Sequence, residues 1–165
     1  MFIPLGLQDG LKERIEDVLK DLTYDTPLDN GQTSLRKVKV FTQNLPVKKK
    51  SDDNPFPFVL IKLVDGTQSN RVSDHSVKAF FIAGIYDDSF ENNGHREAVN
   101  LINKIMQTLS ERPIIAHKYE ADFDSPVSWS LPEEETTPYY YASMAVFFDA
   151  QKITRLERED LERFM

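Results

Sequence analysis

Cysteine is absent from the 165-residue chain, and glycine occurs only six times. Without cysteine the chain has no disulfide framework, no thiolate nucleophile and no cysteine-ligated zinc site. The few glycines form neither a glycine-rich phosphate-binding loop nor the Gly-x-Ser-x-Gly turn that would activate Ser125 or Ser128. These absences exclude several common catalytic classes.

The chain also has fewer basic than acidic residues. The chain has 20 Lys and Arg residues against 27 Asp and Glu residues, which gives a formal net charge of −7. A surface that neutralises many phosphates needs the opposite balance. Sequence-specific DNA binding is therefore not expected.

No long apolar run marks the start of the chain. The first ten residues, MFIPLGLQDG, lack a basic region, and their apolar run is shorter than a signal peptide or membrane span requires. We therefore expect a soluble protein that is made in a cytoplasm and has no membrane partner.

The residues that are present predict one globular domain over residues 1–150 and a charged helical tail over residues 151–165. Apolar residues recur at helical spacing over residues 7–23. A second apolar stripe, ended by Pro113, predicts a helix that contains Val99, Ile102, Met106 and Leu109. Loops are expected at 23–35, 46–57 and 121–137.

Five segments read as strands, and Asp65-Gly66 reads as a hairpin turn. The predicted strands are Lys37–Thr42, Phe58–Val64, Val77–Tyr86, Ile114–Glu120 and Tyr139–Phe148. The pattern predicts an α+β fold with a mixed or antiparallel sheet and helices packed on one face. Three of the strands are apolar on both faces, so the second face needs a cover: another sheet, the terminal helix or another subunit.

One short loop carries the residue types of a metal or acid/base site. It contains Asp87, Asp88, Glu91 and His95. Their spacing matches no metal-binding motif, whereas acids and asparagines are typical of a turn that leads into a helix, with Asn92 or Asn93 as its cap. The structural interpretation is favoured, and neither a metal nor another cofactor is expected.

Other candidate catalysts are isolated. His75 and His117 have no partner motif in the sequence. A metal-dependent hydrolase remains as an alternative, in which the loop at residues 87–95 meets Glu120 or Asp122. Because no catalytic constellation is evident, the chain is not expected to be an enzyme.

The order of elements and two stretches of sequence resemble a known family. The stretch from Ile85 to Leu109 is an aspartate-bearing turn that leads into the helix NLINKIMQTL, and PYYYASMAVFF later forms an aromatic strand. Between them lies a long loop with Trp129 and prolines. Together these features resemble the tail terminator, or tail-completion, proteins of phages and prophages with long, non-contractile tails.

The resemblance implies an α+β subunit that assembles into a six-membered ring on the last ring of a tail tube. Such a ring stops tube polymerisation and presents the surface that joins the head. Its partners would be copies of itself, the tail tube protein and a head–tail connector or neck protein, with DNA passing through the lumen without specific binding. The protein would be assembled in the host cytoplasm and reside at the head-proximal end of the virion tail. A neck or head-closure protein, or a tail-tube subunit, remains an alternative.

Two segments are candidate contact regions in this interpretation. The loop with Lys48, Lys49 and Lys50 would face the tube or the head, unless it is only a solvated loop. The tail has apolar residues among mixed charges and needs a surface to dock on, which is either its own domain or a partner. The predicted oligomer-interface residues are Trp129, Arg155, Leu156, Leu161 and Phe164. The stretch Glu120–Glu135 contains no Lys or Arg, which suits a wall past which DNA must slide.

Overall fold

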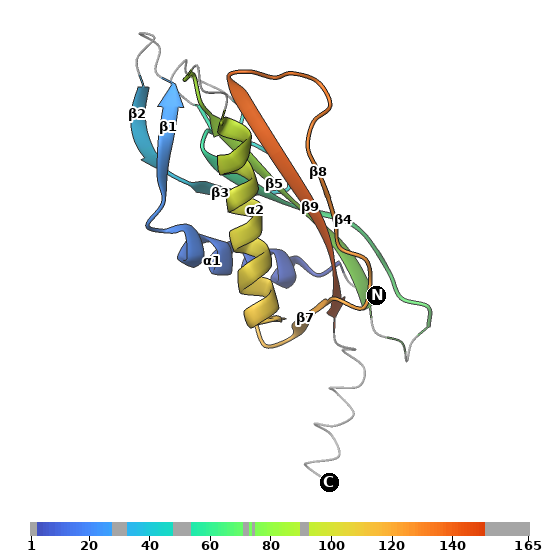
Figure 1. The fold of residues 1–165 in the computed structure, drawn as a ribbon. Coiled ribbons are helices and arrows are strands. Elements are labelled where there is room, and N and C mark those ends of the chain that lie inside the picture. Colours follow the sequence, from blue (N-terminus) through green and yellow to red (C-terminus); the bar gives the residue numbers. More distant parts are fainter. Residues whose placement is uncertain are drawn as a thin grey trace.

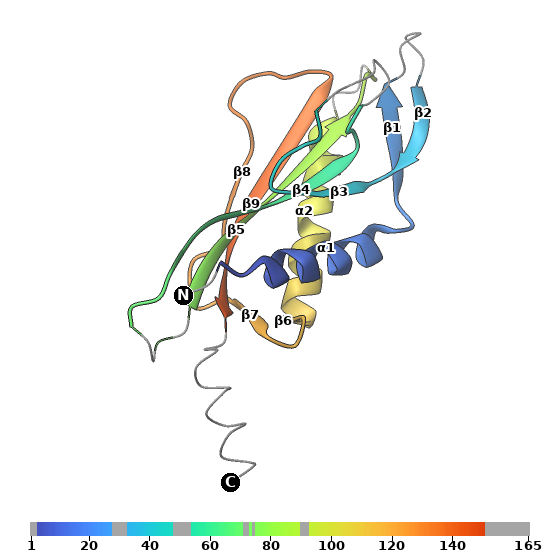
Figure 2. The ribbon, with the colours of Figure 1, turned by 180° about the vertical axis from the view of Figure 1, so that it is seen from behind.

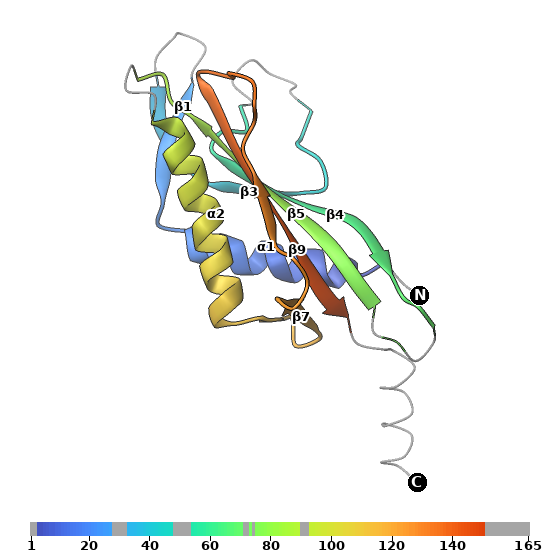
Figure 3. The ribbon, with the colours of Figure 1, turned by 45° about the vertical axis from the view of Figure 1, so that its right-hand side comes forward.

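A mixed sheet forms the centre of the computed structural model, which describes residues 3–27, 33–47, 54–70, 73, 75–89 and 93–150. Within these residues the sheet has seven strands in the order β3-β4-β5-β9-β7-β6, and β8 pairs with β9. The strands are β3 (Lys39–Thr42), β4 (Phe58–Thr67), β5 (His75–Tyr86), β6 (Ile114–Ile115), β7 (Tyr119–Asp122), β8 (Ser128–Ser130) and β9 (Tyr139–Ala150). Figure 3 shows β4, β5 and β9 side by side.

Strand pairing is almost entirely antiparallel. Strand β5 pairs with β9 along its full length, from His75 opposite Ala150 to Tyr86 opposite Tyr139. Among the described strands, the pair β3 and β4 is the one that runs parallel. The predicted strands at 37–42, 58–64, 77–86 and 139–148 are therefore confirmed, with small changes at their ends.

Two helices in the described part of the chain cover one face of the sheet. Helix α1 (Leu5–Leu19) and helix α2 (Gly94–Glu111) cross at a steep angle (Figures 1 and 2). Their apolar stripes pack on one continuous core formed by alternate residues of the long strands. The prediction of a single α+β domain with helices on one face is confirmed.

A hairpin replaces the loop expected at residues 23–35. Strands β1 (Thr23–Pro27) and β2 (Thr33–Lys37) pair antiparallel beside the start of α2 (Figure 1). Tyr24 packs on the core, and its burial together with the nearby Glu97 carboxylate raises the pKa of its hydroxyl. This tertiary packing overrides the weak local strand preference of a polar, proline-containing segment.

The prediction of a hairpin turn at Asp65-Gly66 is wrong. Both residues lie within β4, where Asp65 pairs with Lys78 and Gly66 pairs with Val77. The register shifts between Leu63 and Asp65, so Val64 forms a bulge and the strand continues to Thr67. The hairpin between β4 and β5 therefore turns after Thr67.

The strand expected at 114–120 is divided in two. Strands β6 and β7 pair antiparallel across a tight turn in which Ala116 and His117 have positive φ angles of 52° and 60°. Neither residue is a usual choice for this conformation. The loop expected at 121–137 likewise contains the end of β7 and the short strand β8.

Gly84 allows two strands to approach closely, and this gives a first prediction. It lies opposite Phe58, and a Cβ added there would be 2.2 Å from Cε1 of the buried Phe58 ring. We expect Gly84→Ala to lower the free energy of unfolding by about 1–3 kcal/mol through overpacking, measured by chemical denaturation. The double variant Gly84→Ala/Phe58→Leu is expected to recover part of this loss, and additive effects would contradict the contact.

Candidate interaction surfaces

The sheet face opposite the helices is covered in part by the chain itself. At one end of this face Phe56, Phe58 and Leu60 form a small buried cluster with aromatic residues of β5 and β9. The ring centroid of Phe56 lies 5.1 Å from that of Phe58 and 4.8 Å from that of Tyr139. The segment before β4 thus supplies some of the cover that the two-faced strands require.

The rest of this face is only half-buried. Phe80 on β5 lies opposite Lys62 on β4, and Lys78 lies opposite Phe147 on β9. The Lys78 Nζ atom is 5.3 Å from the ring centroid of Phe80 and 5.8 Å from that of Phe147, so one cation lies over two aromatic rings. We call these four side chains, Lys62, Lys78, Phe80 and Phe147, the open face.

A second apolar surface lies on the helix side of the sheet. Helix α2 and strand β8 lie on the two sides of β9 (Figure 1), and between them is a groove of about 330 Å³. We call it the α2–β8 groove. Its lining residues are mostly apolar: Val99, Ile102, Asn103, Met106, Val127, Trp129, Ser130, Leu131, Ala142, Ser143 and Met144.

Trp129 is the most prominent side chain of this groove. It lies on β8 opposite Met144, and 73% of its surface is exposed. Leu131 is also exposed, at 38%. A large aromatic side chain this exposed at the rim of an apolar groove is typical of a contact surface, although its role in an interface stays a prediction.

Acidic residues follow the side of β9 that pairs with β7 and β8. The chain leaves β7, which pairs with the end of β9, passes through β8 and reaches the beginning of β9. The side chains of this stretch include Glu120, Asp122, Asp124, Glu133, Glu134 and Glu135. We call this stretch along β9, from Glu120 to Glu135, the acidic border.

Asp122 has a structural task on this border. Its carboxylate accepts hydrogen bonds from the Ser125 hydroxyl at 2.6 Å and from the backbone N–H groups of Asp124 and Ser125 at 3.0 and 3.3 Å. The Ser125 hydrogen bond, assisted by these backbone bonds, lowers the pKa of the Asp122 carboxyl. Asp122 therefore closes the turn after β7, and its carboxylate oxygens accept hydrogen bonds from within that turn.

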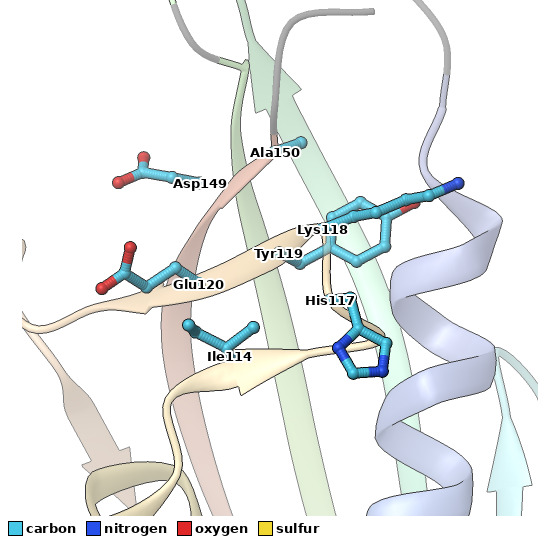
Figure 4. A pocket seen from close by; sticks show the side chains of 7 residues that line it. All are labelled: Ile114, His117, Lys118, Tyr119, Glu120, Asp149 and Ala150. Carbon is cyan, nitrogen blue, oxygen red and sulfur yellow. The ribbon is translucent and has the colours of Figure 1, made fainter. Parts of the chain in front are cut away.

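A hollow at the end of β9 holds two further candidates, His117 and Glu120. Glu120 lies opposite Asp149, and Figure 4 shows their carboxylates extending to the same side of the strands. The imidazole of His117 lies at the other side of the hollow, on the β6–β7 turn. The hollow does not direct these three side chains toward one point.

The loop before α2 is built as a turn. The Asp87 carboxylate accepts a hydrogen bond of 2.9 Å from the Ser89 backbone N–H, and Asp88 accepts one of 3.4 Å from the Tyr86 hydroxyl. Asn93 precedes the helix but makes no side-chain capping bond in the described structure, so its expected capping role is wrong. Glu91 and Asn92 lie outside the described residues.

His95 faces a different segment. It lines a hollow with Tyr140 and the acidic loop at residues 131–137. In the described part of the chain, no group of three His, Asp or Glu side chains could hold a metal ion. The loop at 87–95 therefore does not gather its described candidates into one site.

The alternative hydrolase site is also separated in space. Asp87 follows the residue that pairs with Tyr139, whereas Asp122 and Glu120 lie opposite Phe147 and Asp149. At about 3.3 Å per residue, these positions along β9 are roughly 26–33 Å apart. The structure does not bring together the acids on which that alternative depends.

The remaining predicted contact residues lie outside the described part of the chain. They are Lys48, Lys49, Lys50, Arg155, Leu156, Leu161 and Phe164.

No protein-family model matches the sequence, and no curated protein matches it either. Neither described helix combines the length and the apolar character that crossing a lipid bilayer requires.

The turn geometry gives a second prediction. In Asp87→Ala/Asp88→Ala/His95→Ala we expect only the loss of loop hydrogen bonds, which lowers the free energy of unfolding by about 0.5–1.5 kcal/mol per bond. Calorimetric titration of the wild-type protein with Mg²⁺, Mn²⁺ or Zn²⁺ is expected to show no stoichiometric binding at this loop. Tight binding that the triple variant abolishes would contradict this interpretation.

Proposed function

We propose that this chain is a structural subunit of a phage or prophage virion that caps the completed tail tube as a homo-hexameric ring. The ring stops tube polymerisation and provides the surface to which the head is joined. In this role the chain acts by assembly, without catalysis or a cofactor, and the virion tail is its place of action.

The observation that carries the proposal is the apolar surface left on the isolated subunit. The open face exposes parts of Phe80 and Phe147, and the α2–β8 groove exposes Trp129 on the other side of the sheet. A subunit with apolar surfaces on two sides can contact a neighbour on each side, as closed rings require. The resemblance of Ile85–Leu109 and Tyr139–Phe148 to tail terminator proteins is the reason for proposing a ring that caps a tail tube.

The acidic border supports the same assembly. DNA that passes through a ring must not adhere to its wall, and carboxylates repel the phosphate backbone. The stretch from Glu120 to Glu135 places several carboxylates along one edge of the sheet and contains no Lys or Arg. We propose that this edge faces the lumen or its entrance.

Deletion of the gene from its phage or prophage tests the proposal. If the chain is a terminator, we expect electron microscopy to show tail tubes of abnormal length that are not joined to heads. Expression of the wild-type chain from a plasmid should restore joined tails of normal length. Normal, joined tails in the deletion strain would overturn the proposal.

The same experiment separates the alternatives. Loss of a neck or head-closure protein leaves tails of normal length that fail to join heads, because polymerisation still stops. Loss of a tube subunit leaves no tubes at all. Immunogold labelling then checks the position of the chain, which we expect at the head-proximal end of each tail.

A further inference from the structure

We infer that the α2–β8 groove is the acceptor for the C-terminal segment, residues 153–164, of a second copy of this chain. The inference rests on the proposed ring and names the contact that links its neighbouring subunits. The groove belongs to the described domain, and its occupant is identified by three properties of the sequence that follows Ala150: apolar pattern, reach and charge.

The first property is the apolar pattern. The groove has the chemistry of a site for an amphipathic segment, with Val99, Ile102 and Met106 on one wall and Val127, Trp129 and Leu131 on the other. The C-terminal segment carries its large apolar residues at spacings of three, five and three: Ile153, Leu156, Leu161 and Phe164. In a helical conformation, Ile153, Leu156 and Phe164 fall on one side together with the acidic Asp160, and Leu161 lies at the border of this side.

The second property is reach, which favours a neighbour over the same chain. The floor of the groove is at Ala142 and Met144, six to eight residues before Ala150, or roughly 20–26 Å along β9. The three residues from Ala150 to Ile153 span at most about 10 Å. Ile153 therefore cannot enter the groove of its own chain, whereas the whole stripe can enter the groove of another copy.

The third property is charge. Beside the apolar stripe, Lys152 and Arg163 are eleven residues apart, which is three helical turns, so both fall on the same flank of a helix; with Glu159 beside them, this flank keeps a net positive charge. The rim of the groove at Leu131 continues directly into the acidic residues Glu133, Glu134 and Glu135. A basic flank against an acidic rim fixes the orientation of the docked segment.

Cross-linking of the full-length chain tests the contact, and the absence of native cysteine makes it unambiguous. One cysteine replaces Met106 in the groove and a second replaces Leu161 in the C-terminal segment. A short bismaleimide is added to the concentrated protein or to isolated tails. The matched control pairs the same Leu161→Cys with Lys62→Cys, which lies on the open face.

We expect a ladder of covalent multimers from the groove pair and none from the control pair. An internally cross-linked monomer would overturn the inference, because it would place the segment in the groove of its own chain. Equal ladders from both pairs, or no product from the groove pair, would also overturn it. If the groove pair gives covalent dimers but no larger products, the docking contact stands and the proposed ring is overturned. If microscopy shows rings but the groove pair gives no cross-linked product, the ring stands and the docking contact is overturned.

Trp129 provides an independent readout because it is the only tryptophan in the chain. A segment docked over its indole, which is 73% exposed in the isolated subunit, is expected to shift the emission to shorter wavelength as the protein concentration rises. Leu156→Asp/Phe164→Asp should need at least about 30-fold more protein for the same shift, since buried anchors of this kind carry much of a binding energy. Glu162→Ala, on the side of the segment opposite the apolar stripe, is the control; an equal effect of both variants contradicts the inference.

Discussion

Deletion of residues 153–165 is expected to leave a folded monomer that no longer assembles or completes tails. Within residues 3–150 both helices already pack on the sheet in one continuous core, and we expect this packing to persist when the segment is removed. Burial of Leu156, Leu161 and Phe164 against a neighbour would contribute about 1.5–3 kcal/mol for each side chain, which is a large share of a subunit contact. We expect thermal unfolding to show a melting temperature close to that of the intact monomer, and complementation of the deletion strain to fail.

Two outcomes would contradict this prediction. If the truncated monomer is unfolded or strongly destabilised, the segment belongs to the core of its own domain. If the truncated chain still yields infectious, joined particles, the segment is dispensable for assembly. The chain with Glu162→Ala is the matched control, because it changes the segment without removing an apolar side chain, and it should complement fully.

The sequence predicted the parts of the fold whose apolar periodicity is strong. The helical spacing that begins at Leu7 predicted α1, although this helix ends at Leu19 and not at residue 23, because strand β1 begins at Thr23. The spacing from Val99 to Leu109 and the alternation in β5 and β9 are also visible without tertiary context. The hairpin of β1 and β2 was missed because it is polar and gains its stability from contact with the body of the domain. The β6–β7 turn was missed because Ala116 and His117 adopt positive φ angles that neither residue signals.

The candidate surfaces were predictable to a smaller extent. Trp129 was predicted as a contact residue, and the structure places it at the surface. The groove beside it could not be predicted, because it depends on β8, a three-residue strand inside a predicted loop. The two-faced strands predicted that a cover is needed, and the structure adds that Phe56 supplies part of it. No local pattern shows that Lys78 would lie over two aromatic rings, because Phe147 reaches it from a strand distant in the sequence.

Replacement of Phe80 by aspartate is expected to abolish ring assembly while the domain stays folded. Phe80 is half-buried on the open face, and Lys62 and Lys78 are beside it, so the new carboxylate has cationic partners in the monomer. The monomer should lose about 1–2 kcal/mol from reduced apolar burial and the lost cation–π contact. In the ring, however, the carboxylate would be buried against a neighbour at a much larger desolvation cost.

The same substitution at another exposed phenylalanine provides the control for Phe80→Asp. Phe123 is 42% exposed in the turn after β7 and lies outside both the open face and the groove, so Phe123→Asp should assemble normally. Light scattering and negative-stain microscopy of the assembled protein, together with complementation of the deletion strain, compare the two variants. Normal rings from Phe80→Asp would show that the open face is not a subunit contact, and the half-buried aromatic pair under Lys78 would then be a feature of the monomer alone.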